Sequence, residues 1–158
     1  MNKATGLIPP VQKSVRVARP QADVFRLYTA HYGRWWPLNT HSIGGEKAIN
    51  AVMEPRKGGR LYEEWSDGTT MPYGEVLVWE PPHRVVHTWY VGHQPHQTSE
   101  VELRFVALSA RETMVELEHR NWETMAGDKA RELRDRYNNG WEIVFIDKFA
   151  SYAAKTEA

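Results

Sequence analysis

The sequence predicts an α+β domain in which a curved, seven-stranded antiparallel sheet wraps around a long C-terminal helix, with two short helices after the first strand. Three observations lead to this fold class. Apolar and polar residues alternate along most of positions 46–119, which is typical of half-buried strands. Short turns separate these segments, and strands linked by hairpins pair antiparallel. Finally, residues 128–152 carry a helical repeat long enough to cover one face of such a sheet.

The first part of the chain is expected to form the first strand and the short helices. Residues 11–18 alternate as a strand, with three valines on one face. Pro20 suits a first helical turn and Gly33 suits a helix stop, so a short amphipathic helix is expected from about 20 to 32. Two adjacent tryptophans follow, beside Pro37.

Six further strands are expected between positions 46 and 119. The strongest hairpin signal is Asp67-Gly68, because this pair readily adopts the positive φ angles of tight hairpin turns. Near the start of the region, Ile49, Ala51 and Met53 share one face of the first of these strands. The segments with strand-like alternation lie at 49–54, 61–65, 76–78, 85–91, 100–105 and 115–119.

The last predicted element is a long amphipathic helix. Asp128 is expected to cap its N-terminus, and the apolar repeat continues to about Tyr152. Because no other segment is long enough to cover the sheet, the sheet must curl around this helix. A cavity is then left wherever the sheet and the helix diverge. The apolar stripe of the helix consists of Leu133, Tyr137, Trp141, Val144, Phe145, Phe149 and Tyr152.

Composition excludes several classes of function. The 20 basic and 20 acidic residues balance, whereas a nucleic-acid-binding protein needs a basic excess on one face, so no nucleic-acid partner is expected. The chain has no cysteine, which excludes disulfides, zinc–thiolate sites, iron–sulfur clusters and cysteine nucleophiles. No run approaches the ~20 apolar residues of a membrane span. We therefore expect one domain over residues 11–155, no membrane association and a cytoplasmic location, with a flexible lead over residues 1–10 that lacks a signal-peptide core.

Aromatic residues are numerous, with seven Trp, seven Tyr and four Phe. Buried indoles and phenols combine apolar area with one polar atom, which suits the lining of a ligand cavity, although the same rings also suit an aromatic core. A small apolar ligand is the partner that such a lining predicts. The candidate pocket residues are Trp35, Trp36, Glu63, Trp65, His87, Trp89, His119, Tyr137, Trp141 and Phe145.

Three of these candidates are ionisable and form a weak candidate catalytic set. Strand parity places Glu63, His87 and His119 on the helix side of the sheet, because the residues two positions away are apolar. A contact between Glu63 and His87 would form an acid/base pair in an apolar pocket. Alternatively, each group is satisfied by water or by the backbone. His31 and His41 flank the tryptophan pair and could join a site only through folding.

His93 and His96 form the only pair with metal-like spacing. A catalytic zinc site usually needs three protein ligands, and no carboxylate lies nearer than Glu100. A solvated loop is therefore expected here, and neither a metal nor a cofactor is predicted. The sequence also lacks a glycine-rich phosphate loop in a strand–loop–helix setting and a Gly-x-Ser-x-Gly nucleophile elbow.

An ordered set of motifs carries a resemblance to a known family. The set comprises Trp35-Trp36-Pro37, the run EPRKGGR at 54–60, Asp67-Gly68, Gly74-Glu75-Val76, Trp79-Glu80-Pro81-Pro82, the run TMVELEH at 113–119, and Gly140-Trp141. Over residues 11–155 it resembles the activator-of-heat-shock-protein-ATPase-homologue (AHSA-type) family of the START-like, SRPBCC superfamily, which has the helix-grip fold. The resemblance implies that lipids, polyketides, hormones or other apolar ligands bind in a central cavity. It also implies cyclase or other enzyme activity in some branches, and a co-chaperone role in the eukaryotic members that gave the family its name.

Three functions follow from these observations. The preferred hypothesis is non-catalytic binding of a small hydrophobic or aromatic ligand in the cavity between the sheet and the C-terminal helix. The second is a cyclase-like or hydrolase-like enzyme that uses the three ionisable residues named above. The third is a co-chaperone-like module that binds a chaperone through an exposed apolar patch on the outer face of the sheet, around Val86, Thr88 and Tyr90. Tyr90 and the edge strands could equally form a homodimer contact.

Overall fold

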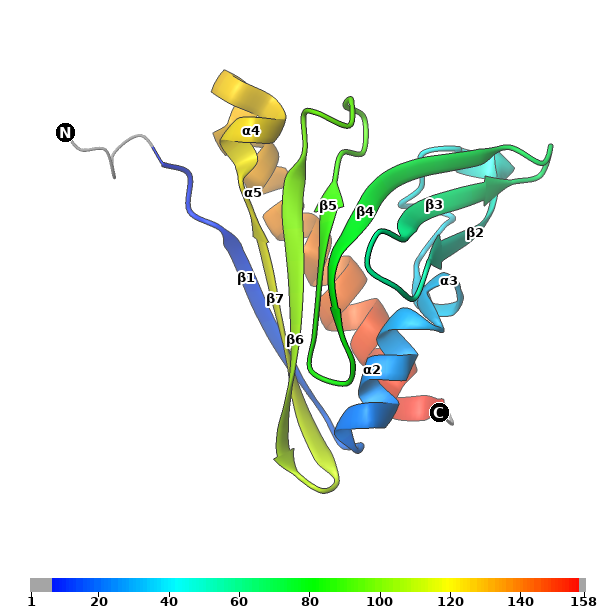
Figure 1. Ribbon diagram of the computed structural model, residues 1–158, viewed down its shortest axis with the longest axis vertical. Helices are drawn as coiled ribbons and strands as arrows, with labels where there is room; N and C mark the ends of the chain where they lie inside the picture. The colour runs from blue at the N-terminus through cyan, green and yellow to red at the C-terminus, as the bar shows by residue number, and fades with distance from the viewer. Residues whose placement is uncertain (1–6, 157–158) are drawn as a thin grey trace.

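A single seven-stranded antiparallel sheet forms the frame of the molecule. The computed structural model describes residues 7–156, and its strands follow the order β1-β7-β6-β5-β4-β3-β2. Figure 1 shows the sheet curving in front of the long C-terminal helix, which confirms the predicted fold class. The strands are β1 (Val11–Val17), β2 (Ala48–Met53), β3 (Arg60–Trp65), β4 (Thr70–Glu80), β5 (Arg84–Trp89), β6 (Ser99–Ser109) and β7 (Glu112–Arg120).

The two ends of the sheet are β1 and β2. The first strand pairs with the last one, with Val15 opposite Val115, and every other neighbouring pair is a hairpin or follows directly in sequence. Residues 7–10 precede β1 without regular structure. The rest of the predicted flexible lead, residues 1–6, lies outside the described residues.

Two short helices, α2 (Gln21–Thr29) and α3 (Tyr32–Trp35), follow β1 as predicted. The turn η1 (Gly45–Lys47) leads into β2. After β7 the chain forms α4 (Trp122–Ala126), the turn η2 (Gly127–Lys129) and then one long rod. The rod consists of α5 (Ala130–Trp141), the π-helical segment η3 (Glu142–Phe149) and α6 (Ala150–Lys155). None of the helices within residues 7–156 is both long and apolar enough to cross a membrane.

The predicted cap of the long helix is wrong. Asp128 lies inside η2, and the residue at the N-cap of α5 is Lys129, which makes no side-chain capping bond. The reason is the preceding helix α4, which the sequence pattern did not predict. Because α4 connects to α5 through a tight turn rather than an extended loop, no Asx-type cap with extended backbone can form there.

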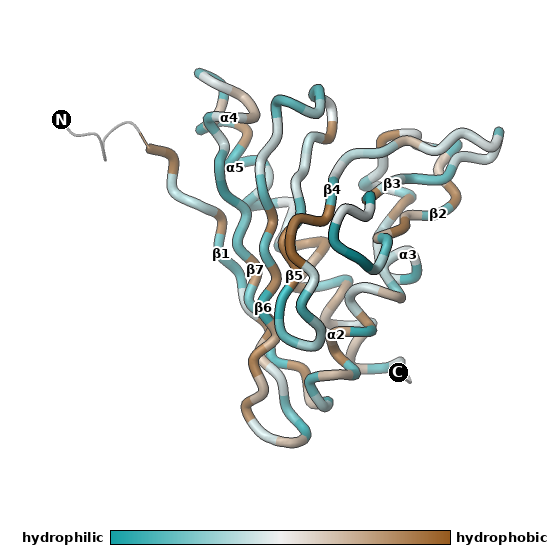
Figure 2. The backbone as a smooth tube through the Cα atoms, in the orientation of Figure 1, coloured by the Kyte–Doolittle hydropathy of each residue, from teal (hydrophilic) through white to brown (hydrophobic). Residues whose placement is uncertain are grey.

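The core fills the space between the concave face of the sheet and the rod. On β6, Val101, Leu103 and Phe105 are buried, as their alternation predicts, and Phe145 and Phe149 meet them from the rod. Figure 2 shows strong hydrophobic colour midway along β4 and β5, and a hydrophilic turn between β2 and β3. The strand periodicity thus determines which side chains face the helix.

A bulge changes the expected face of one residue on β2. Ala51 and Met53 are buried as their shared face predicts, but Ile49 is 62% exposed. The pairing between β2 and β3 shifts register between Ala48 and Asn50. A bulge adds one residue to one strand, so the side chain of Ile49 leaves the face of its neighbours.

The outer face of the sheet is charged rather than apolar. At its centre the carboxylate of Glu102 pairs with Arg84 at 2.7 Å, Arg104 at 3.2 Å and Arg120 at 2.6 Å. Burial alone would raise the pKa of Glu102, but hydrogen bonds from Arg120 and Arg84 and the charge of Arg104 lower it to about 2.

The residues proposed for an exposed apolar patch do not form one. Val86 is 3% exposed, and Thr88 and Tyr90 are only partly exposed. The hydroxyl of Thr88 accepts a hydrogen bond from the backbone N–H of Glu75. These three residues therefore give no support to an apolar docking surface for a chaperone.

Candidate functional site

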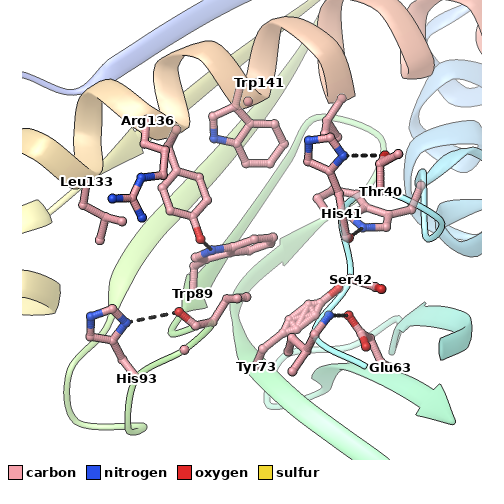
Figure 3. Close-up of a pocket in the computed structure, with 17 residues that line it drawn as sticks. Thr40, His41, Ser42, Glu63, Tyr73, Trp89, His93, Leu133, Arg136 and Trp141 are labelled. Atoms are coloured by element: carbon pink, nitrogen blue, oxygen red, sulfur yellow. Dashed lines mark hydrogen bonds between the residues drawn. The ribbon is translucent and has the colours of Figure 1, made fainter. Parts of the chain in front are cut away.

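A partly open cavity of about 530 Å³ lies between the concave side of the sheet and α5. The segment between α3 and η1 closes a third side. Figure 3 shows the lining side chains converging from the helix, from the sheet and from this segment. They are Trp36, Thr40, His41, Ser42, Ile43, Glu63, Tyr73, Trp89, Val91, Gly92, His93, Leu133, Arg136, Tyr137, Gly140, Trp141 and Val144.

Three indole rings form the centre of the cavity wall. The ring of Trp36 lies 5.8 Å from that of Trp89 and 6.1 Å from that of Trp141, and the last two are 5.8 Å apart. One ring comes from the segment after α3, one from β5 and one from α5. Such contacts between tilted rings add to the free energy of burial and fix the orientation of each ring. The wall is therefore a rigid aromatic surface.

A chain of hydrogen bonds behind the wall connects the indole of Trp141 to the backbone of Trp89 through His119. Trp141 Nε1–H donates to His119 Nδ1 at 3.0 Å. His119 Nε2–H must then be the protonated nitrogen, and it donates to Ser99 Oγ at 2.7 Å. Ser99 in turn donates to the carbonyl of Trp89 at 3.0 Å. His119 is thus a positioning residue for Trp89 and Trp141.

The carboxylate of Glu63 holds the segment that closes the third side. It accepts hydrogen bonds from the backbone N–H groups of Ile43 at 2.6 Å and Gly44 at 3.0 Å, and from Trp65 Nε1–H at 3.0 Å. Bonds to a charged acceptor are stronger than those between neutral groups. Glu63 lies at the edge of the cavity and fixes the chain that carries His41 and its neighbours.

The structure brings together half of the pocket residues predicted from the sequence. Trp36, Glu63, Trp89, Tyr137 and Trp141 line the cavity. Of the remaining five, Trp35 and Phe145 pack in the core, Trp65 supports the chain at Gly44, His119 lies behind the indoles, and His87 is buried within β5.

The three ionisable candidates are held apart by separate partners. His87 Nδ1–H donates to the carbonyl of Thr88 at 2.9 Å, and burial lowers the pKa of His87 to about 4 against the opposing effect of that bond. Burial, with a further contribution from His87, lowers the pKa of His119 well below its ordinary value. Within residues 7–156 no hydrogen bond joins Glu63, His87 and His119 to one another, so each is satisfied as in the non-catalytic interpretation.

Several lining residues were not among the candidates. Residues 40–43 contribute four side chains from a segment without periodicity, and the only signal in the sequence was the position of His41 near the tryptophan pair. His93 also lines the cavity, while its Nδ1–H donates to the carbonyl of Val91 at 3.1 Å. Across the described residues, no three His, Cys, Asp or Glu side chains are grouped as metal ligands.

A second hollow of about 690 Å³ lies on another part of the molecule, between α2 and the turn that joins β4 to β5. Its largest aromatic residues are Phe25 and Trp79, whose rings contact each other edge to face at 5.2 Å. It has none of the three mutually contacting indoles of the first cavity. We therefore take the first cavity as the candidate site.

A curled antiparallel sheet that closes on a C-terminal helix over an aromatic cavity defines a protein of the helix-grip class. Residues 18–154 match the family model described as "Activator of Hsp90 ATPase homolog 1-like protein". The chain therefore belongs to this family, which confirms the family resemblance. Among curated proteins no sequence matches significantly.

Solved structures share this fold over almost their whole length. One, titled an anthrahydroquino-Gama-pyrone synthase Txn09, is 32% identical, with 92% of this chain and 97% of that chain covered and a TM-score of 0.61. The self-sacrificing resistance protein CalC from Micromonospora echinospora is 25% identical, with coverages of 94% and 98% and a TM-score of 0.66. The HSP90 activator PFC0360w from Plasmodium falciparum is 19% identical, with coverages of 88% and 91% and a TM-score of 0.62, and shows the fold alone.

Proposed function

We propose that this protein binds a small, planar, hydrophobic or aromatic ligand in the cavity between the sheet and α5. The observation that carries the proposal is the wall of three mutually contacting indoles, Trp36, Trp89 and Trp141, around a space of about 530 Å³. Ligand pockets of proteins are mostly apolar clefts of ~300–1,000 Å³ with a few oriented polar groups. Flat rings offer a flat ligand large contact areas at little cost in conformational entropy.

The similarity to Txn09 supports the same class of ligand. Txn09 is described as an anthrahydroquino-Gama-pyrone synthase, and anthrahydroquinones and pyrones are planar ring compounds. The chain shares 32% of its residues with that protein over 92% of its length. A planar aromatic ligand for this chain agrees with both the wall and this relative.

The second candidate function is a ring-forming enzyme. The observation that favours it is the 32% sequence identity to the synthase Txn09. The present cavity offers the aromatic surface on which such a reaction would be oriented. A binder returns its ligand unchanged, whereas an enzyme consumes it. Product analysis after prolonged incubation of the protein with a linear aromatic polyketide precursor distinguishes the two functions.

Gly140 offers a direct test of binding. It lines the cavity between Tyr137 and Trp141, and a Cβ built on it meets no atom within 4 Å. Because the Cβ position is open, we expect the Gly140→Leu side chain to occupy part of the cavity, and the substitution also removes a glycine from the interior of a helix. Gly140→Ala is the matched control, since it makes the same backbone change with little added volume.

We expect equilibrium dialysis with fluorene, a planar tricyclic hydrocarbon, to show binding to the wild type and to Gly140→Ala. Gly140→Leu should bind at least tenfold more weakly, while its urea unfolding midpoint is no lower than that of the wild type. Equal affinities for all three proteins would refute the proposed site.

A further inference from the structure

Most polar groups that line the cavity already have partners within the protein. The carboxylate of Glu63 accepts three hydrogen bonds, and the hydroxyl of Tyr73 donates to Tyr32 Oη at 3.3 Å. At the outer end of the cavity, the guanidinium of Arg136 pairs with Glu132 at 3.2 Å, and both side chains are largely exposed. The groups left for a ligand are therefore few.

Tyr137 has a donor that nothing in the described part of the chain accepts. Its hydroxyl oxygen accepts a hydrogen bond from Trp89 Nε1–H at 2.9 Å. Within residues 7–156 its own proton has no acceptor. Burial raises the pKa of Tyr137 despite the opposing bond from Trp89, so the group stays protonated at neutral pH. Tyr137 therefore presents an O–H donor to the cavity.

His41 presents a second group without a protein partner. Its Nδ1 lies 2.7 Å from Thr40 Oγ1, and this hydroxyl also lies 3.4 Å from the carbonyl oxygen of Pro37. The one hydroxyl proton can go to either acceptor, so the contact with Thr40 occupies Nδ1 in either tautomer. Nε2 has no protein partner within residues 7–156. Figure 3 shows the ring of His41 beside the cavity, with its second nitrogen turned away from Thr40.

Two polar groups without protein partners in the described residues, His41 Nε2 and the Tyr137 hydroxyl, thus line one apolar cavity. Leaving such a group unpaired when a ligand displaces water weakens binding, because the group loses its hydrogen bond to water without gaining another. A pure hydrocarbon would leave both groups unpaired, whereas a ligand with matching groups would satisfy them. A site of this kind discriminates strongly against analogues that lack the matching group.

We propose that the ligand is a planar aromatic compound with both a hydroxyl group, which forms a hydrogen bond with His41 Nε2 as donor or as acceptor, and a ketone or quinone carbonyl, which accepts from the Tyr137 hydroxyl. This assignment rests on the proposed function and narrows its ligand class to hydroxylated aromatic ketones. His93 is the competing partner of the ligand hydroxyl, because its Nδ1 proton is bonded to Val91 and its Nε2 is also free of protein partners in the described residues. Figure 3 shows this second nitrogen of His93 pointing away from Trp89.

Three probes separate the two contacts. Fluorene has neither polar group, 2-hydroxyfluorene adds a hydroxyl donor, and 9-fluorenone adds a carbonyl acceptor without a donor. In equilibrium dialysis, the wild type should bind 2-hydroxyfluorene and 9-fluorenone each about tenfold more tightly than fluorene. His41→Leu should lose the gain for 2-hydroxyfluorene and keep the gain for 9-fluorenone. Tyr137→Phe should show the reverse pattern.

Matched controls carry the same substitutions outside the cavity. His96→Leu changes an exposed histidine of the neighbouring loop, and Tyr62→Phe changes a tyrosine that packs on Arg60. Both should bind all three probes as the wild type does. Each variant is checked by its urea unfolding midpoint, and the probe series on the wild type remains informative if Tyr137→Phe does not fold.

Three results would overturn the assignment. If the wild type binds the three probes with equal affinity, the cavity does not recognise polar groups, although the proposed function stands. If His93→Leu rather than His41→Leu removes the gain for 2-hydroxyfluorene, the residue that binds the ligand hydroxyl is misassigned. If the wild type binds none of the probes, the proposed function fails as well.

Discussion

The buried imidazole of His87 predicts a loss of stability in mild acid. The side chain is 1% exposed, and its pKa falls from 6.5 to about 4, chiefly because burial disfavours the charged ring. The unfolded chain takes up a proton on this histidine below pH 6.5, while the folded protein does so only near pH 4. The stabilising contribution is therefore complete above pH 6.5 and is lost as the pH falls toward 4.

The magnitude follows from the two pKa values. The difference between 6.5 and about 4, at ~1.4 kcal/mol per pH unit, corresponds to about 3 kcal/mol of unfolding free energy at pH 4. His119 acts in the same direction, because burial also lowers its pKa. Glu102 acts at lower pH, since its pKa is about 2 rather than the usual 4.5.

Urea unfolding at pH 7 and pH 4 measures the effect. His87→Asn retains an N–H donor for the carbonyl of Thr88 but cannot titrate in this range. Its unfolding free energy should fall between the two pH values by about 3 kcal/mol less than that of the wild type. His96→Asn, which changes an exposed histidine, should behave as the wild type. An unchanged pH dependence in His87→Asn would refute the reasoning, because the carboxylates contribute equally to both proteins and burial, the larger cause of the lowered pKa of His119, is the same in both.

Two further predictions concern the sheet. Glu102→Gln removes the carboxylate charge that pairs with three arginines on the outer face of the sheet. Because those arginines are partly solvated, we expect a loss of about 2 kcal/mol in unfolding free energy at pH 7. The difference from the wild type should shrink as the pH falls toward 2, where Glu102 becomes protonated. A constant difference down to pH 2 would contradict the ion-pair explanation. Gly74→Ala places a Cβ against the carbonyl oxygen of Thr88, a backbone atom that cannot move freely. Thermal unfolding should therefore show a loss of about 1–3 kcal/mol, whereas the unhindered Gly140→Ala should gain about 0.5–1 kcal/mol. A Gly74→Ala variant as stable as the wild type would show that β4 and β5 can separate at this point.

The architecture was predictable because burial follows the period of each segment. The alternation of Val101, Leu103 and Phe105 placed them on the concave face, and the repeat around Trp141 and Phe149 placed these rings on the rod. Alternation determines a face wherever one side of a sheet is buried. Alternation does not show where a strand is interrupted, so it could not predict the bulge that exposes Ile49.

The site was predictable only where it is built on regular elements. Trp89 and Tyr137 are on a strand and a helix, whose side-chain directions are fixed by the backbone. His41 is on a segment placed by the bonds from Ile43 and Gly44 to Glu63, which join positions about twenty residues apart in sequence. Strand parity correctly put Glu63 on the inner side, yet it could not show that the carboxylate binds backbone N–H groups rather than His87. Partners brought together by tertiary folding leave no local pattern.

The most direct test of the central claim is the response of individual indole N–H signals in NMR spectra when fluorene is added. Binding in the cavity should shift the Nε1–H resonances of Trp36, Trp89 and Trp141, which form its wall. Those of Trp79, in the second hollow, and Trp122, which is buried behind His119, should stay in place. Shifts confined to Trp79, or no shift of any indole at saturating fluorene, would contradict a ligand site between the sheet and the helix.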